Sequence, residues 1–535
     1  MSETVEAMPT TSIHSEASSG NTLPHVWPSV VHMLAHAAVA YPDHEAVVLG
    51  EQRVSYGQLA ASASAFASQL RALGAGPGQR IALLMSNSAD MVVAIFAIQA
   101  SGAQLVPLNP AYTGAELEPI LEDAECLALV YDTAVAERLA QQVATFDMSH
   151  RFAIGPGSSC LVLRDESDVA LPLPLPEPDD LALLLYTGGT TGRPKGVNLT
   201  HRAVATNTSQ RDALLPTREG IERLLVITPL FHSYALATTY TSVYACGTLV
   251  LLTKYKPAAV LRLVDDERIT ILAASPTIFI GLLACEELAS ASLASLTCSY
   301  SGSAALPLET LRQWELRSGS VVVEGYGQTE AGPVLTYNPL HGPRKSGTVG
   351  PAVPDTEIQI VDPDTGLQVL GPGQIGEIRA RGPQIMKGYR GLPNETATAL
   401  RDGWLYTGDL GEVDTDGYFT IRDRKKDMVI VSGFNVYPRE IEEALSRHPQ
   451  VRESAVVGIP DGYRGEALAA LVVAVGHLDE DVLREYLAQR LVKYKQPAQL
   501  HFVSTLPKTA VGKPDKVRIR RDLATTGSIP PTLSL

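Results

Sequence analysis

Short apolar runs of β type alternate with longer helical patterns through the first two-thirds of the chain. The runs RIALLM and QLVPL flank the helical pattern ADMVVAIFAIQASG, and LALVYD follows the helical pattern GAELEPILEDAE. Such alternation is typical of βαβ units, in which helices join parallel strands. It predicts an α/β fold built from parallel sheets flanked by helices.

The pattern of predicted elements changes after about residue 345. Shorter extended runs separated by the turn sequences PDTG and GPGQ predict a β-rich subdomain, and DTDGYFTIRDRKKD predicts a hairpin that runs into a charged segment. A small α+β pattern follows. Since 535 residues exceed what one core usually supports, we predict a disordered tail over residues 1–22, a large domain over 23–422 and a small C-terminal domain over 423–535.

Composition excludes several classes of protein. A net charge of −15 argues against nucleic-acid binding, which needs a basic surface. The N-terminal tail lacks the apolar core of a signal peptide, and the apolar stretch Ile269–Cys285 is short for a membrane span and is broken by Pro276. We therefore expect no membrane span.

The five cysteines are scattered and have no histidine cluster beside them. Their spacing indicates neither a disulfide framework nor a zinc site, and it favours a reducing, cytoplasmic location.

The stretch YTGGTTGRPKG follows the apolar run LALLLY. It is not a P-loop, because Lys195 precedes Gly196 and not the Ser or Thr that would hold magnesium. Its glycines still allow backbone N–H groups to turn inward, and its hydroxyls and lysine add donors and charge. A phosphate-binding loop is favoured over a plain turn, with these candidate residues: Thr187, Gly188, Gly189, Thr190, Thr191, Gly192 and Lys195.

Further along the chain, four segments carry polar groups suited to a nucleotide. EGYGQTEAG places Thr329 beside Glu330, so that a phosphate donor stands next to a magnesium ligand. YTGDLG presents Asp409 in a glycine-flanked turn, where a carboxylate can accept hydrogen bonds from ribose hydroxyls. Arg424 follows in DRKKDMVIVSGFNVYP, and Lys513 follows a glycine in LPKTAVGKPDK.

In this order and at this spacing, the five motifs resemble the adenylate-forming superfamily, which includes acyl-CoA synthetases, aryl-CoA ligases and peptide-synthetase adenylation domains. The resemblance covers nearly all of the chain after residue 25. It implies that residues 23–422 are an AMP-binding adenylation domain and 423–535 a lid. PLFHSYAL and GYGQTEAGPVL look like 4-coumarate–CoA ligases, whereas DRKKDMVIVSGFNVYP looks more like long-chain fatty acyl-CoA synthetases.

The resemblance implies an acid–thiol ligase that uses ATP, Mg²⁺ and coenzyme A, and it assigns roles for making an acyl-adenylate. The glycine-rich loop holds the β- and γ-phosphates, Thr329 the α-phosphate and Glu330 magnesium. Asp409 and Arg424 hold the ribose, while Lys513 bridges the attacking carboxylate and the α-phosphate. The adenine lies between Ser301–Ala305, which includes Ser303 and Ala304, and the pair Gly325 and Tyr326. His232 gates the reacting carboxylate, and Tyr234 and Thr238 line the acyl pocket.

The resemblance also implies a second half-reaction, in which the small domain swings about Lys426. Gly433 then lines the channel for the thiol, and Lys254 contacts a CoA phosphate. A basic segment from Tyr486 to Arg521, with nine Lys or Arg against one acid, is expected to face these polyanions.

Two alternatives stay open at this point: a ligase that loads a carrier-protein phosphopantetheine, and a nonenzymatic nucleotide-binding protein. The carboxylic acid is either a medium- to long-chain fatty acid or an aryl-propenoate. The chain is expected to be a monomer or a homodimer.

Overall fold

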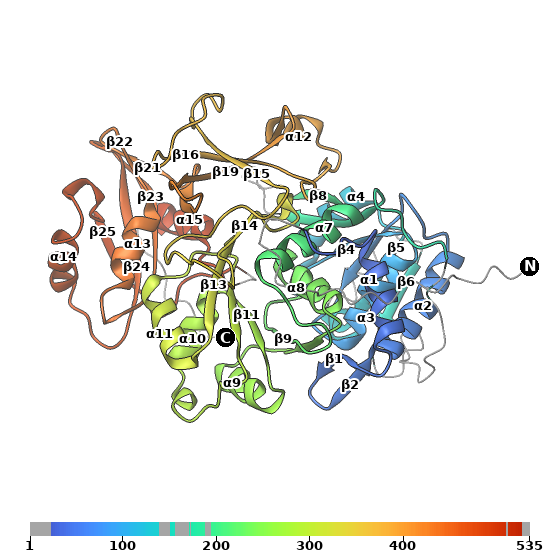
Figure 1. Ribbon diagram of the computed structural model, residues 1–535. Helices are drawn as coiled ribbons and strands as arrows, with labels where there is room; N and C mark the ends of the chain where they lie inside the picture. The colour runs from blue at the N-terminus through green and yellow to red at the C-terminus, as the bar shows by residue number, and fades with distance from the viewer. Residues whose placement is uncertain are drawn as a thin grey trace, which may run out of the picture.

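The chain folds into a large α/β region and a smaller C-terminal unit that lie side by side (Figure 1). The computed structural model describes residues 23–138, 150–155, 171, 173–187, 194–509 and 512–526. These residues form four sheets, and parallel strands joined by helices dominate the two largest. The predicted fold class is confirmed.

The first large sheet has eight strands in the order β14-β13-β12-β11-β9-β10-β1-β2. Its six inner strands are parallel to their neighbours, and the two edge strands are antiparallel. The bounds are β1 Glu45–Leu49, β2 Gln52–Ser55, β9 Arg223–Val226, β10 Thr248–Leu251, β11 Ile271–Ala274, β12 Cys298–Ser301, β13 Val321–Tyr326 and β14 Thr336–Tyr337.

The second large sheet has the order β17-β8-β7-β4-β3-β5-β6. Its β7 and β8 form an antiparallel hairpin, and the predicted phosphate loop connects these two strands. The bounds are β3 Arg80–Leu84, β4 Gln104–Pro107, β5 Ala128–Asp132, β6 His150–Ile154, β7 Leu181–Thr187, β8 Lys195–Thr200 and β17 Gly388–Tyr389.

Helices fill the space between the two large sheets and cover their outer faces. One hydrophobic cluster joins strands of both sheets through α1, α2, α3 and α8; α9 to α11 cover the other face of the first sheet, and α4 that of the second. Within the described ranges, no helix is both long enough and apolar enough to cross a membrane. The bounds are α1 Val30–Ala40, α2 Tyr56–Ala72, α3 Ala89–Ala100, α4 Gly114–Ala124, α5 Thr133–Arg138, α7 His201–Leu214, α8 Ser233–Tyr244, α9 Pro257–Asp266, α10 Pro276–Leu283 and α11 Leu308–Ser318.

A β-rich sheet and the C-terminal sheet complete the fold. The first contains β15, β16, β19, β18 and β20, and the second has the order β22-β21-β24-β23 with β25 on β24. The predicted boundary between residues 422 and 423 falls inside β20, and β21 is the first strand of the C-terminal sheet. The bounds are β15 Glu357–Val361, β16 Gly376–Arg381, α12 Pro393–Ala399, β18 Leu400–Arg401, β19 Trp404–Val413, β20 Phe419–Arg424, β21 Val429–Val431, β22 Phe434–Val436, α13 Pro438–Ser446, β23 Val451–Asp461, β24 Gly465–Ala474, α14 Glu480–Ala488, β25 Gln499–Phe502 and α15 Lys516–Thr526.

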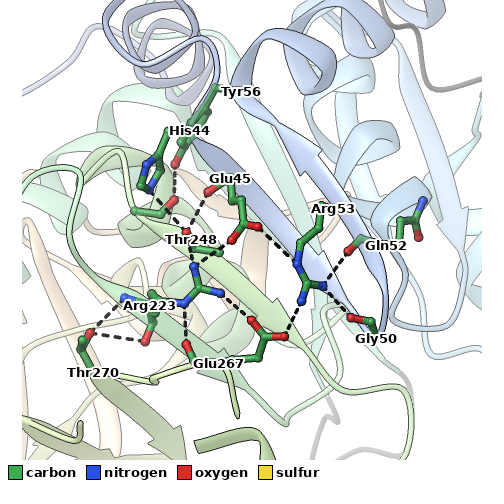
Figure 2. Close-up of polar contacts among 11 residues, drawn as sticks. His44, Glu45, Gly50, Gln52, Arg53, Tyr56, Arg223, Thr248, Glu267 and Thr270 are labelled. Atoms are coloured by element: carbon green, nitrogen blue, oxygen red, sulfur yellow. Dashed lines mark hydrogen bonds and ion pairs between the residues drawn. The ribbon is translucent and has the colours of Figure 1, made fainter. Parts of the chain in front are cut away.

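A network of ion pairs ties together the amino ends of strands in the first large sheet (Figure 2). The Arg223 guanidinium, at the start of β9, lies 2.9 Å from the Glu45 carboxylate and 2.6 Å from that of Glu267. Arg53 on β2 lies 2.6 Å from Glu267 as well. This end of the sheet is therefore fixed by charge, which leaves the opposite, carboxyl ends of the strands for a ligand, as is usual in α/β sheets.

Candidate active site

The carboxyl ends of three parallel strands of the first large sheet, β9, β12 and β13, bring several of the predicted motifs together. The segment with His232 follows β9, and Ser301–Ala305 begins at the end of β12. The end of β13 carries Gly325 and Tyr326, and the short 3-10 helix η2 (Thr329–Ala331) follows it. The alternation of strands and helices places these segments along one edge, although they are up to about a hundred residues apart in sequence.

Packing alone explains one of the predicted adenine-wall residues. A Cβ on Gly325 would lie 2.3 Å from Cε1 of the Tyr337 ring on β14, so no larger residue fits there. The neighbouring wall residue Ser303 has a φ of +72°, and Ala304 is exposed. Gly325 thus has a structural role in addition to the one predicted for it.

The predicted ribose residues form a pair across β19 and β20. Asp409 lies opposite Arg424 in the register, and the Arg424 Nε is 3.2 Å from the Asp409 Oδ1. The Tyr326 hydroxyl donates to the Asp409 Oδ2 at 2.7 Å. Burial raises the pKa of Asp409, and the Arg424 charge opposes that rise. The contact with Tyr326 links the ribose pair to the adenine wall.

The predicted phosphate and magnesium residues meet at Tyr389. Its hydroxyl donates to the Glu330 Oε1 at 3.0 Å, and the Lys195 Nζ lies 5.1 Å from the centroid of its ring. Thr329 donates from its Oγ1 to the Ser233 Oγ at 3.3 Å. Lys195 and Glu330 therefore approach the same place from different sheets, as a site for a phosphate chain and its metal requires.

The C-terminal lysine reaches into this edge of the large region. The Thr277 Oγ1, just beyond β11, donates to the carbonyl oxygen of Gly512 at 2.9 Å and holds the loop that carries Lys513. Burial lowers the pKa of Lys513 to about 8, with a further contribution from the Arg424 charge, while the Asp409 charge acts in the opposite direction. Lys513 thus lies beside the predicted ribose pair.

His232 lies at the amino end of α8 with its ring near Lys513. Its Nδ1 accepts a hydrogen bond from the Tyr234 backbone N at 3.3 Å, so the histidine caps the helix. Burial lowers the pKa of His232 to about 4, and the Lys513 charge adds to the decrease. The His232 ring is therefore neutral near pH 7. It can contact a ligand through its shape and hydrogen bonds, but not through a positive charge.

The predicted acyl-pocket residues lie on the first two turns of α8. The Tyr234 hydroxyl donates to the Tyr300 carbonyl oxygen at 3.1 Å, and the Thr238 Oγ1 donates to the Tyr234 carbonyl oxygen at 3.0 Å. A Cβ on Gly302 would lie 2.8 Å from the Tyr234 ring. These contacts fix the Tyr234 ring against the end of β12.

Residues 34–390 match the AMP-binding enzyme family, and residues 440–513 match the C-terminal domain of AMP-binding enzymes. The chain belongs to this family. It is 36% identical to the long-chain-fatty-acid–CoA ligase of Bacillus subtilis (strain 168), over 92% of this chain and 95% of that one. It is 37% identical to the feruloyl-CoA synthase of an Amycolatopsis species, over 90% and 96% of the two chains. The crystal structure of ATP-bound MatB from Rhodopseudomonas palustris superposes with a TM-score of 0.84 at 34% identity, covering 92% of this chain and 99% of that one.

Part of the predicted site of this AMP-binding enzyme falls outside the described residues. The phosphate loop predicted over Gly188, Gly189, Thr190, Thr191 and Gly192 lies in the range 188–193, which the structure does not describe. Its two ends are described. Thr187 and Lys195 face each other in the hairpin of β7 and β8, and the Lys195 side chain lies over the ring of Tyr389.

Of the residues predicted for the second half-reaction, Lys426 shares the neighbours Asp409 and Arg424 with Lys513. Lys426 follows β20, and burial lowers its pKa. Gly433, with a φ of +84°, and Ser432 form the turn between β21 and β22. Lys254 is exposed in the segment between β10 and α9. Their proposed roles belong to a different orientation of the small domain and stay predictions.

The basic C-terminal segment is partly neutralised within the chain. Several of its lysines and arginines pair with carboxylates of the small domain, and the contact with polyanions expected from the sequence stays a prediction. The pairs are Lys495–Glu440, Lys508–Glu453, Lys516–Glu442, Arg518–Asp522 and Arg520–Asp427.

The fold brings one cysteine close to possible metal ligands, which its position in the sequence does not indicate. The side chains of His36, Glu219 and Cys246 lie within 4.8 Å of one another. Burial raises the pKa of the Cys246 thiol to about 12, with a further contribution from Glu219, so the group is a protonated thiol and not a ready thiolate ligand.

Sequence reasoning missed two residues of the site. Tyr389 joins Lys195 to Glu330, and Thr277 holds the loop of Lys513. Tyr389 stands in the glycine- and charge-flanked run MKGYRG, which is a local signal that could have indicated it, whereas Thr277 stands in no such motif. Thr277 is found only when β11 is seen to end beside β9 and β12, the strands whose ends carry other residues of the site.

Proposed function

We propose that this acyl-CoA ligase joins a carboxylic acid to coenzyme A in two half-reactions. In the first, the carboxylate attacks the α-phosphorus of ATP, which forms an acyl-adenylate and releases pyrophosphate. In the second, the CoA thiol takes the acyl group and AMP leaves. The observation that carries the proposal is the position of Lys513 beside the Asp409–Arg424 pair and His232.

Each residue of the site has a task in the first half-reaction. Asp409, with Arg424 behind it, accepts hydrogen bonds from ribose hydroxyls, and Thr329 donates to the α-phosphate. Lys513 places its charge between the incoming carboxylate and that phosphate. Displacement at phosphorus needs such positioning and charge neutralisation more than a protein nucleophile. Neutral His232 orients the acid without competing for its charge.

Magnesium fits the donor set at η2. The Glu330 carboxylate is the kind of hard oxygen ligand that Mg²⁺ prefers, and Tyr389 orients it by hydrogen bonding to Oε1. When bound, magnesium neutralises charge on the phosphate chain and on the leaving pyrophosphate. Lys195, at the end of the phosphate loop, adds a second positive charge on the same side.

We assign the second half-reaction to a rotated small domain that turns about Lys426. The rotation would withdraw Lys513 and bring the hairpin turn at Gly433 towards the acyl-adenylate. Lys254, which is exposed, would be free to contact a CoA phosphate. A carrier-protein phosphopantetheine is the alternative acceptor, since it presents the same thiol arm.

A panel of acids tests the function. Fatty acids of graded length, cinnamates and benzoates are each supplied with ATP and Mg²⁺, with and without CoA, and pyrophosphate and thioester are measured separately. We expect pyrophosphate release with at least one acid and thioester only when CoA is present. Pyrophosphate without CoA-dependent thioester would indicate a carrier protein as the acceptor, and no pyrophosphate with any acid would contradict the proposal.

The pH dependence of the first half-reaction tests the role of Lys513. A lysine with a pKa of about 8 is charged below that pH and loses its charge above it. We expect kcat/KM for acyl-adenylate formation to fall about tenfold per pH unit above pH 8, since kcat/KM reports groups of the free enzyme. Lys513→Arg, which stays charged, should be slower but lack this fall. Pyrophosphate exchange measured from pH 6.5 to 10 checks both, and a wild-type profile that stays flat above pH 8 would contradict the assignment.

A further inference from the structure

An arginine is buried in the third turn of α7, and the two terminal nitrogens of its guanidinium make no hydrogen bond to the described residues. Arg211 is 4% exposed. Its guanidinium carbon lies 4.5 Å from the centroid of the Tyr300 ring. Its Nη1 and Nη2 are buried and have no hydrogen-bond partner among the described residues. The neighbouring Asp212 carboxylate accepts from the backbone and hydroxyl of Thr217, at 2.9 and 2.6 Å, and its charge also acts on Arg211.

Such an arrangement is unfavourable unless something completes it. A buried guanidinium without hydrogen-bond acceptors loses its hydration and gains no direct pairing in return. The Tyr300 hydroxyl is likewise buried without a partner in the described part of the chain. The hydroxyl is close enough to act on the guanidinium, but neither it nor the two Nη groups make a well-aligned hydrogen bond. Buried donors in this condition indicate that an oxygen from outside the chain can bind beside them.

The position of Arg211 indicates which ligand would bring that oxygen. The side chain lines a cavity between α7 and α8 that is also bounded by Ser233, Thr241, Pro333 and Val334. Ser233 accepts a hydrogen bond from Thr329, the proposed α-phosphate residue, so the cavity begins beside the reacting centre. Its volume is about 10 Å³, roughly the room of one water molecule. The acid must displace side chains to enter, and a long saturated chain would displace the most.

We propose that Arg211, with the Tyr300 hydroxyl, binds an oxygen-bearing group on the part of the acid away from its reacting carboxylate. The inference rests on the proposed function, and it narrows the substrate to acids that carry a second carboxylate or a phenolic oxygen. A guanidinium offers a planar fork of donors that fits a carboxylate with two hydrogen bonds and a phenolic oxygen with fewer. Saturated acids that end in a methyl group leave both donors unpaired and are disfavoured.

Matched pairs of acids test this preference. Cinnamate is compared with 4-hydroxycinnamate and 4-carboxycinnamate, and octanoate with octanedioate, by measuring kcat/KM for pyrophosphate release. For the wild type we expect at least one oxygen-bearing acid to exceed its apolar partner by 100-fold or more, since sites built to hydrogen-bond a substrate reject the analogue that lacks the group. Arg211→Met should reduce that ratio to within about threefold of unity, mainly through KM. A preference for 4-hydroxycinnamate would indicate that Arg211 binds a neutral phenolic group, and a preference for 4-carboxycinnamate would indicate that it binds an anionic carboxylate.

The control variant is Arg223→Met, which removes another largely enclosed arginine, at the start of β9 in the ion-pair network of Figure 2. It should lower the midpoint of thermal unfolding and leave the ratio between paired acids unchanged. Arg211→Met, in contrast, should unfold at or above the wild-type midpoint, because it removes a buried guanidinium whose two Nη groups make no hydrogen bond. A purely structural role for Arg211 would instead lower the midpoint and slow all acids equally.

Two outcomes would overturn the inference while leaving the proposed function intact. In one, the wild type activates acids but prefers the apolar member of every pair. In the other, the Arg211→Met variant keeps the wild-type ratio. If no acid releases pyrophosphate, the proposed function itself is wrong and the inference falls with it.

Discussion

Replacing Lys513 with alanine is expected to abolish acyl-adenylate formation and to spare transfer of the acyl group from supplied acyl-adenylate to CoA. The lysine lies beside Asp409 and Arg424, where it would meet both the attacking carboxylate and the α-phosphate. Its charge stabilises the carboxylate and the α-phosphate, which react with each other only in the first half-reaction. Loss of one such donor from a preorganised site costs roughly 10²–10³-fold in rate. Pyrophosphate exchange measures the first half-reaction, and thioester yield from synthetic acyl-adenylate measures the second.

The matched control is Lys508→Ala, in the same segment. Lys508 pairs with Glu453 at 2.6 Å within the small domain and points to no part of the proposed site. Its removal should leave both half-reactions near the wild-type rate. If Lys513→Ala slows both half-reactions to the same extent, the lysine supports the domain as a whole and the assigned role is wrong.

The fold class could be predicted because its signal is local. Strand and helix periods in RIALLM, ADMVVAIFAIQASG and QLVPL correspond to β3, α3 and β4, and these strands pair in parallel as the alternation requires. The order of strands could not be predicted. β9 lies between β10 and β11, and β1 joins β10 across about two hundred residues. Such pairings depend on how distant segments pack together, and no short stretch of sequence carries a signal for that packing.

In the candidate site, too, the sequence indicates the charged residues but not the contacts that position them. Asp409, Arg424, Glu330 and Lys513 stand in motifs with glycines and charges that the sequence displays, and the structure brings the first two into contact and the last beside them. The partners that position them are ordinary residues. A count of charges in the basic C-terminal segment does not show which carboxylates fold against them, so the contact of this segment with polyanions stays a prediction.

Replacing Gly433 with leucine is expected to have the opposite effect to the Lys513 variant. Gly433 occupies the turn between β21 and β22 with a φ of +84°, and a Cβ built there meets nothing within 4 Å. In this orientation of the small domain, a leucine therefore costs only the strain of a left-handed backbone, about 1–2 kcal/mol. Acyl-adenylate formation should stay near the wild-type rate. If the turn lines the channel of the thiol after the domain rotates, the leucine side chain fills it, and thioester formation should fall by about 10²-fold or more.

The turn strain and the bulk of the side chain can be separated by two further variants. Gly433→Ala carries nearly the same strain with a single methyl group, so a smaller loss of thioester formation than in Gly433→Leu indicates a steric block. Gly417, in the turn between β19 and β20, has a φ of +83° and equally open surroundings. Gly417→Leu should therefore match the strain of Gly433→Leu without affecting either half-reaction. Normal CoA turnover in Gly433→Leu would mean that the glycine serves the hairpin turn alone, because the domain rotation would then bring no channel wall to this position.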